Sequence, residues 1–118
     1  MTDALLVLTN LPDSATAQAL ARHLVEHRLA ACVNVLAPCR SVYRWRDTLE
    51  EADEVPLLIK TTAERYAALE SAIRAQHPYE LPEIVAVSVE RGLPGYLAWM
   101  AAETVLAPTG DGPAPQAS

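Results

Sequence analysis

The chain contains no phenylalanine, only two cysteines and four glycines, and no long apolar run. Aromatic residues make up 5% of its 118 residues, so a core must be assembled mainly from the small and branched side chains that raise the hydrophobic fraction to 51%. No apolar stretch approaches the ~20 residues that a helix needs to cross a bilayer. The N-terminus also lacks the basic start of a signal peptide. We therefore expect a cytoplasmic protein that does not enter a membrane.

Positive charge is scarce as well, because the chain has 9 Lys and Arg residues but 15 Asp and Glu residues, which gives a formal net charge of −6. An acidic chain repels phosphate backbones, so nucleic-acid binding is not expected. The length predicts one domain over residues 1–106. Residues 107–118 offer almost nothing to bury and are predicted to be a disordered tail. Cys32 and Cys39 are expected to be free, buried thiols.

The pattern of apolar residues predicts a mixed order of strands and helices. Residues 4–8 form a continuous apolar run typical of a buried strand. Residues 15–28 repeat apolar side chains with helical spacing after a possible cap at Asp13 or Ser14. A second helix is expected between a cap at Thr62 and Gln76, because Pro78 disfavours helical geometry at the residue before it. Residues 84–89 suggest a last strand and residues 96–103 a terminal helix. This order predicts an α+β fold, the ferredoxin-like split βαβ sandwich with a long hairpin and a C-terminal helix.

The stretch between the two main helices predicts a long β-ribbon. Residues 32–45 and 51–62 are rich in β-branched and aromatic side chains, and the polar segment 46–54 joins the two runs. Tyr43 and Trp45 are two residues apart, so they share one face near the tip. Exposed aromatic rings on an unprotected strand are a liability that soluble proteins avoid. We therefore expect the ribbon to pack on other copies of the chain, with Tyr43 and Trp45 at the oligomer interface.

The motifs of enzyme active sites are missing. The sequence has no G-x-S-x-G, no Gly-rich phosphate loop and no Cys-x-x-Cys, so we expect a protein that is not an enzyme and has no catalytic residue. His23-Leu-Val-Glu-His27 matches the H-x-x-E-H pattern of one class of zinc peptidases. The rest of such a site is absent, and the solvated edge of a helix is the favoured interpretation.

The connector 77–83 is the most promising place for a ligand. His77 lies in a segment stiffened by two prolines, with Tyr79 and Glu83 nearby. Imidazole and carboxylate groups suit Cu²⁺ or Zn²⁺, so His77 and Glu83 are candidate metal ligands. The alternative is that His77 caps the C-terminus of the preceding helix. Lys60 and Glu83 are expected at one sheet edge, where they form either a structural ion pair or, with Tyr79, a small-anion site.

Several segments together resemble the divalent-cation-tolerance protein CutA family. These segments are residues 12–17 (PDSATA), 29–34 (LAACVN), 41–45 (SVYRW), 58–61 (LIKT) with Glu54, 77–83 (HPYELPE) and 95–99 (GYLAW). The resemblance implies a cytoplasmic homotrimer whose hairpins clasp neighbouring subunits, and a role in tolerance of copper and other divalent metals.

The resemblance also leaves two functions open. In some relatives copper binding has been assigned to a cysteine and two adjacent histidines, and the corresponding residues here are Thr9 and Gln76-His77. The first expected function is weak binding of Cu²⁺ or Zn²⁺ near His77. The alternative is a PII-like sensor that binds a small anion at the cleft between subunits, near Lys60 and Tyr79. A third possibility is a stable scaffold whose metal phenotype is indirect.

Overall fold

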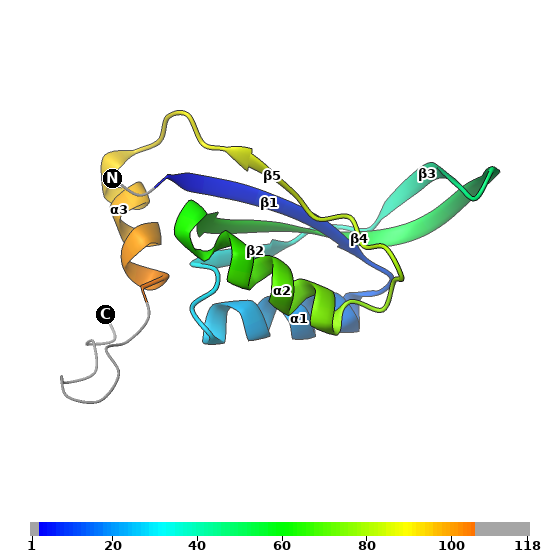
Figure 1. Cartoon of the computed structure of the whole chain (residues 1–118), viewed down its shortest axis with the longest axis horizontal. Coiled ribbons are helices and arrows are strands. Elements are labelled where there is room, and N and C mark those ends of the chain that lie inside the picture. Colours follow the sequence, from blue (N-terminus) through cyan, green and yellow to red (C-terminus); the bar gives the residue numbers. More distant parts are fainter. Residues whose placement is uncertain (1–2, 106–118) are drawn as a thin grey trace.

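The computed structural model describes residues 3–105 and shows an antiparallel sheet with two helices on one face (Figure 1). The elements are β1 (Ala4–Leu11), α1 (Ser14–Glu26), β2 (Cys32–Val35), β3 (Cys39–Trp45), β4 (Thr48–Thr62), η1 (Ala63–Arg65), α2 (Tyr66–Gln76), β5 (Val85–Ser88) and α3 (Pro94–Glu103). The predicted α+β, ferredoxin-like order is confirmed.

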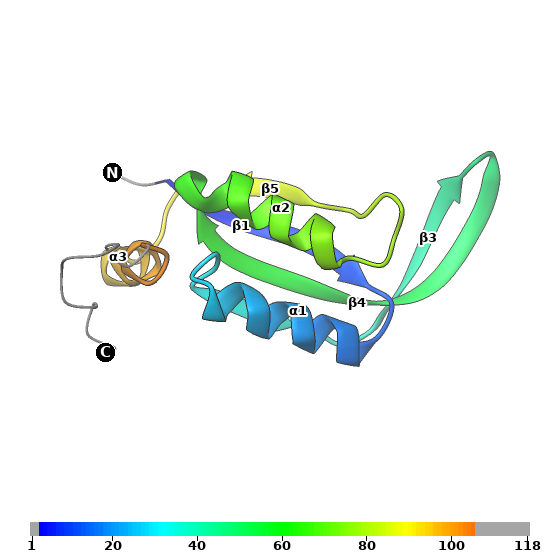
Figure 2. The same cartoon turned by 60° about the horizontal axis from the view of Figure 1, so that its bottom comes forward.

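The sheet is built around β1 and β4, which pair along their whole shared length from Ala4↔Thr62 to Leu11↔Val55. β5 pairs with the other side of β1, and β2 with the other side of β4, so the strand order is β2-β4-β1-β5. Placing β1 in the centre requires the crossover connections that α1 and α2 supply. The two helices lie side by side on the same face of the sheet (Figure 2).

Local chemistry explains where the helices begin and end. Asp13 caps α1, because its Oδ1 accepts the backbone N–H of Thr16 at 2.8 Å. Thr62 makes no such side-chain bond, and the 3-10 turn η1 precedes α2 instead of the predicted cap. α2 ends where His77 takes an extended conformation (φ −76°, ψ 132°) before Pro78. α3 begins at Pro94, two residues earlier than predicted, with proline in its first turn.

The ribbon differs from the prediction in two respects. Its turn consists of Arg46 and Asp47 alone, which both have positive φ (50° and 65°), as a two-residue hairpin turn of type I′ requires. The expected polar connection over 46–54 is therefore wrong beyond Asp47, because β4 runs unbroken from Thr48. The facing strand is interrupted between Val35 and Cys39, so it is two strands rather than one. Cys39, predicted to be buried, is exposed.

The core lies between the sheet and the helices. Val7, Leu57 and Ile59 have no exposed surface and pack against Leu20 and Leu24 of α1 and Leu69 and Ile73 of α2. Neighbouring positions on a strand point to opposite faces. The strand residues that alternate with these core residues therefore form an open face of the sheet, which neither α1 nor α2 covers. The open face includes Leu6, Leu8, Leu58, Val85 and Val87.

Candidate functional site

Three segments meet where the ribbon leaves the sheet, and we call the group of polar side chains there the base cluster. Its members are Asn10 of β1, Glu54 of β4, and His77, Tyr79 and Glu83 of the connector after α2. The topology brings them together, because β1 ends beside the middle of β4 and the connector returns from α2 to begin β5. Sequence analysis identified the three connector residues as candidates but missed the other two.

His77 ties the connector to β1 through its side chain. The imidazole is buried, with 8% of the residue exposed. Its Nε2 donates to the carbonyl oxygen of Asn10 at 2.7 Å, and its Nδ1 accepts the backbone N–H of Tyr79 at 3.2 Å. Burial lowers the pKa of His77 below its ordinary value, against the opposing effects of the Asn10 hydrogen bond and the Glu54 charge. Both ring nitrogens therefore have backbone partners, and a metal ion at either one must replace a hydrogen bond.

The alternative expectation, that His77 caps the C-terminus of α2, is only partly correct. Its backbone N–H does donate to the carbonyl of Ile73 and ends α2. The ring, however, bonds the carbonyl of Asn10 in β1 and not a carbonyl of the helix. His77 is therefore a brace between the connector and the sheet.

Carboxylates converge on the Asn10 amide in the base cluster. Asn10 Nδ2 lies 3.3 Å from Glu83 Oε1 and 3.5 Å from Glu54 Oε1. Glu54 is only 8% exposed, and its carboxylate lies close enough to the Tyr79 hydroxyl to influence it. Burial and the Glu54 carboxylate raise the pKa of Tyr79 well above its ordinary value. Tyr79 therefore stays protonated and acts as a hydrogen-bond donor.

The base cluster offers mainly oxygen ligands to a cation. Across residues 3–105, no group of three or more His, Cys, Asp or Glu side chains is arranged to hold a metal ion. The carboxylates of Glu54 and Glu83 suit a divalent cation, and His77 joins them only if its Nδ1 gives up the bond to Tyr79. Thr9 does not add to this set, because it is 1% exposed on the helix-covered face, whereas Asn10 points the other way.

Lys60 lies away from the base cluster. It pairs in register with Leu6 of β1 and Cys32 of β2, toward the other end of β4. At ~3.3 Å per residue, the six positions from Glu54 to Lys60 span roughly 20 Å. The Lys60 Nζ lies 5.8 Å from the centre of the Tyr96 ring. The expected meeting of Lys60 with Glu83 or Tyr79 therefore does not occur within one chain.

The ribbon tip is anchored to the connector. Arg46 Nη2 lies 2.9 Å and 2.8 Å from the two carboxylate oxygens of Glu80, and its guanidinium stands 5.1 Å from the centre of the Trp45 ring. Tyr43 is 44% exposed, so an aromatic surface is indeed available on the ribbon. The interface role predicted for Tyr43 and Trp45 concerns other copies of the chain and stays a prediction.

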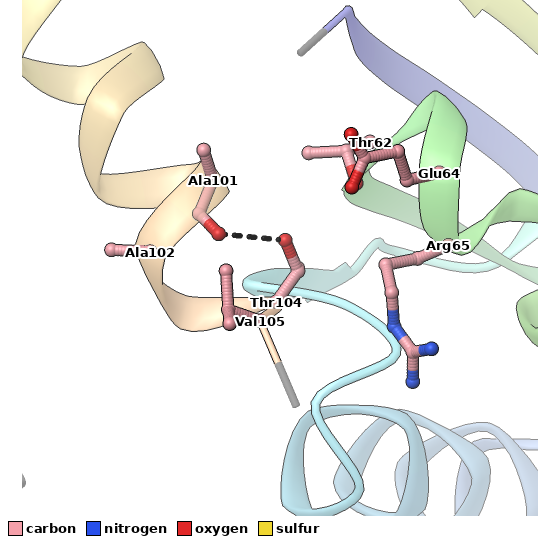
Figure 3. A pocket seen from close by; sticks show the side chains of 7 residues that line it. All are labelled: Thr62, Glu64, Arg65, Ala101, Ala102, Thr104 and Val105. Atoms are coloured by element: carbon pink, nitrogen blue, oxygen red, sulfur yellow. Dashed lines mark hydrogen bonds between the residues drawn. The ribbon is translucent and has the colours of Figure 1, made fainter. Parts of the chain in front are cut away.

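A hollow of about 510 Å³ lies at the opposite end of the molecule (Figure 3). The last turn of α3 and the segment around η1 line it, with Arg65 as its cation. The Arg65 Nε already donates to the carbonyl of Arg28 at 3.2 Å, and the Thr104 hydroxyl donates to carbonyls of its own helix. The Arg65 Nε and the Thr104 hydroxyl are thus already bonded within the fold. Among the described helices, none is long and apolar enough to cross a membrane.

The antiparallel sheet, the two helices on one face and the projecting β3–β4 ribbon define a ferredoxin-like α+β protein. Comparison with known proteins identifies its family. Residues 5–103 match the family described as CutA1 divalent ion tolerance protein. The chain belongs to this family, as the sequence resemblance predicted.

Relatives and solved structures agree with this assignment. The divalent-cation tolerance protein CutA of Pectobacterium atrosepticum is 44% identical over 83% of this chain and 89% of its own length. The CutA homolog of Xenopus laevis is 45% identical over 75% of this chain, which corresponds to 59% of that longer protein. The crystal structure of CutA from Xylella fastidiosa covers 87% of this chain and 99% of its own, with 44% identity and a TM-score of 0.85. A structure from Archaeoglobus fulgidus, 32% identical with a TM-score of 0.84, is described as a periplasmic divalent cation tolerance protein.

Proposed function

We propose that the protein acts as a cytoplasmic homotrimer in divalent-cation tolerance, and that it binds Cu²⁺, or Zn²⁺, weakly at the base cluster without catalysing a reaction. Family membership supports the tolerance role. The observation that carries the binding site is the convergence of Glu54 and Glu83, from distant segments, on the side chain of Asn10 beside His77.

Two surfaces support assembly. Val85 and Val87 on the open face are 48% and 49% exposed, and Val42 and Leu49 on the ribbon are 60% and 65% exposed. Exposed apolar patches are typical of protein interfaces. In the proposed trimer, the ribbon of one copy covers apolar surface of the next, and Tyr43 and Trp45 contribute to that contact.

The geometry of the base cluster accounts for weak, exchangeable binding. A cation at the two carboxylates must compete with the Asn10 amide, and recruitment of His77 costs the hydrogen bond from Tyr79. An intramolecular hydrogen bond contributes a net ~0.5–1.5 kcal/mol, so replacing one lowers affinity by up to about tenfold. Such a site takes up a cation when its concentration rises and releases it when it falls.

Calorimetric titration of Cu²⁺ and Zn²⁺ tests the cation site. Glu83→Gln keeps the shape and the acceptor for Asn10 but removes the charge, so we expect Cu²⁺ affinity to fall about tenfold. Glu90→Gln is the matched control, because Glu90 is also an exposed carboxylate but lies outside the cluster. Equal affinities in wild type and Glu83→Gln would contradict the proposed site.

A sensor function is the second candidate, and the environment of Lys60 favours it. The Lys60 ammonium forms no salt bridge among the described residues and stands over the Tyr96 ring beside the open face. In a trimer, a neighbouring copy would complete an anion site there, with Tyr79 supplied from that copy. A screen of small anions and nucleotides for thermal stabilisation, repeated with Lys60→Met, tests this function; stabilisation that survives the substitution would contradict it.

A further inference from the structure

We propose that His23 and His27, at the C-terminal end of α1, form a separate surface site for a divalent cation, with Cu²⁺ preferred over Zn²⁺. The two residues are four positions apart, so they lie on the same face of the helix. The helical turn between them is intact, because the backbone N–H of His27 donates to the carbonyl of His23 at 3.1 Å. Their ring centroids are 4.1 Å apart.

The hydrogen bonding of His27 leaves its Nε2 free to bind a metal. Its Nδ1 lies 2.9 Å from the carbonyl oxygen of His23, so Nδ1 must carry the proton and donate it. The lone pair is then on Nε2 of an exposed side chain. A histidine that binds a metal usually donates its other ring N–H to a carbonyl or carboxylate, which orients the ring and raises its basicity. His27 has this arrangement before any ion binds.

His23 supplies the second imidazole. It is half-buried, and no hydrogen bond among the described side chains engages its ring nitrogens. Two nitrogens that share one ion, each at ~2.0–2.1 Å, lie on the order of 3 Å apart. The rings are tilted by 32°, so binding requires the unbonded ring of His23 to turn toward Nε2 of His27 while His27 keeps its hydrogen bond.

The electrostatic setting also favours a cation. The carbonyl groups at a helix C-terminus carry partial negative charge, which stabilises positive charge in the last turn. Glu26 lies in the same turn, while the nearby cation of Arg28 is directed to Glu103, with Nη1 3.8 Å from its Oε1. Arg22 is the remaining cation close in sequence and is exposed. Arg65 also reaches this end of the helix, where its Nε donates to the carbonyl of Arg28, so the favourable charges at the site are those of the helix C-terminus and Glu26.

The chemistry of the ligands indicates Cu²⁺. Neutral imidazole suits Cu²⁺ and Zn²⁺, and Cu²⁺ binds nitrogen ligands more tightly in the general order of divalent metals. Two protein ligands leave the remaining positions to water, so binding is reversible. Helix α1 lies on the helical side of the sheet (Figure 2), so assembly through the open face does not require contact with this helix.

Calorimetry and electron paramagnetic resonance of Cu²⁺ complexes test this proposal on the full chain. We expect His23→Gln and His27→Gln each to weaken this Cu²⁺ site by at least tenfold, and the spectrum of the wild type to show coupling to two imidazole nitrogens. The matched control is the double variant His27→Gln with Val25→His, which keeps two solvent-accessible histidines but separates them by two positions. Residues two apart do not face each other on a helix, so this control should bind no better than His27→Gln.

Unchanged Cu²⁺ affinity in both single variants would overturn the proposal, as would full binding by the displaced-histidine control. The proposal does not depend on the base cluster. Loss of binding in Glu83→Gln with full binding in His23→Gln and His27→Gln would support the base cluster and overturn the di-histidine site. Loss confined to the two histidine variants would support the di-histidine site and contradict the base cluster.

Discussion

The two faces of the sheet carry similar apolar side chains but differ in what covers them. On the helix-covered face, Val7, Leu57 and Ile59 are completely buried. On the open face, Val85 and Val87 are about half exposed. Burial of apolar surface is favourable by roughly 25 cal/mol per Å², so the open face retains a driving force for association that the covered face has already used. The folded chain is thus closed on one side and exposes apolar surface on the other.

β4 shows the same contrast along a single strand. From Val55 to Thr61 its residues alternate between buried and half-buried, whereas from Thr48 to Asp53 none is buried. The change occurs at the base cluster, where Glu54 of β4 contacts the side chain of Asn10 and His77 bonds the carbonyl of Asn10 in β1. The base cluster therefore separates the part of β4 that contributes to the core from the part whose side chains stay exposed in the single chain.

A charge placed on the open face should have the largest effect. Val87→Glu puts a carboxylate into the proposed interface, where burial of an unpaired charge costs several kcal/mol. We expect sedimentation to show a shift from trimer to monomer. Val25→Glu is the matched control, because Val25 is similarly exposed (42%) but lies on α1. A trimer that tolerates Val87→Glu as well as it tolerates Val25→Glu would show that the open face is not the interface.

Substitution of His77 should have an intermediate effect, and its pH dependence reveals the mechanism. Because burial lowers the folded-state pKa of His77, the unfolded chain binds a proton more readily. The stabilising contribution is therefore complete above the ordinary value of 6.5 and is lost as pH falls below it, toward the folded-state pKa. His77→Gln retains a donor for the carbonyl of Asn10 but cannot titrate. We expect this variant to lose ~0.5–1.5 kcal/mol at pH 7.5.

Urea unfolding between pH 7.5 and pH 5 provides the measurement. Wild type should lose stability over this interval more steeply than His77→Gln, since only wild type has the buried imidazole to protonate. Parallel pH profiles for the two proteins would show that His77 is not the group responsible. Protein concentration must be equal in both series, because the stability of an oligomer depends on it.

Much of the helix-covered part could be predicted from sequence, because its signals are local. Asp13 precedes a helical repeat of apolar residues, and Pro78 limits α2. The Arg46–Asp47 turn was missed because neither residue is the glycine or asparagine that usually adopts positive φ. The role of His77 could not be predicted either, since its partner is the backbone of Asn10, 67 positions away in sequence. Lys60 and Glu83 were expected at one sheet edge. They are separated because β4 has 15 residues, and Lys60 lies far along it from the base cluster, to which Glu83 belongs.

The tip of the ribbon should show the smallest effect. In the pair of Arg46 and Glu80, one guanidinium nitrogen contacts both carboxylate oxygens, but the two side chains are 68% and 72% exposed. Exposed ion pairs contribute ~0.2–1 kcal/mol and are screened by salt. We expect a double-mutant cycle with Arg46→Ala and Glu80→Ala to give a coupling energy in that range at low salt and close to zero at 1 M salt. A larger coupling that persists at high salt would mean that the pair is desolvated in the assembled protein, and the ribbon tip would then lie inside the interface.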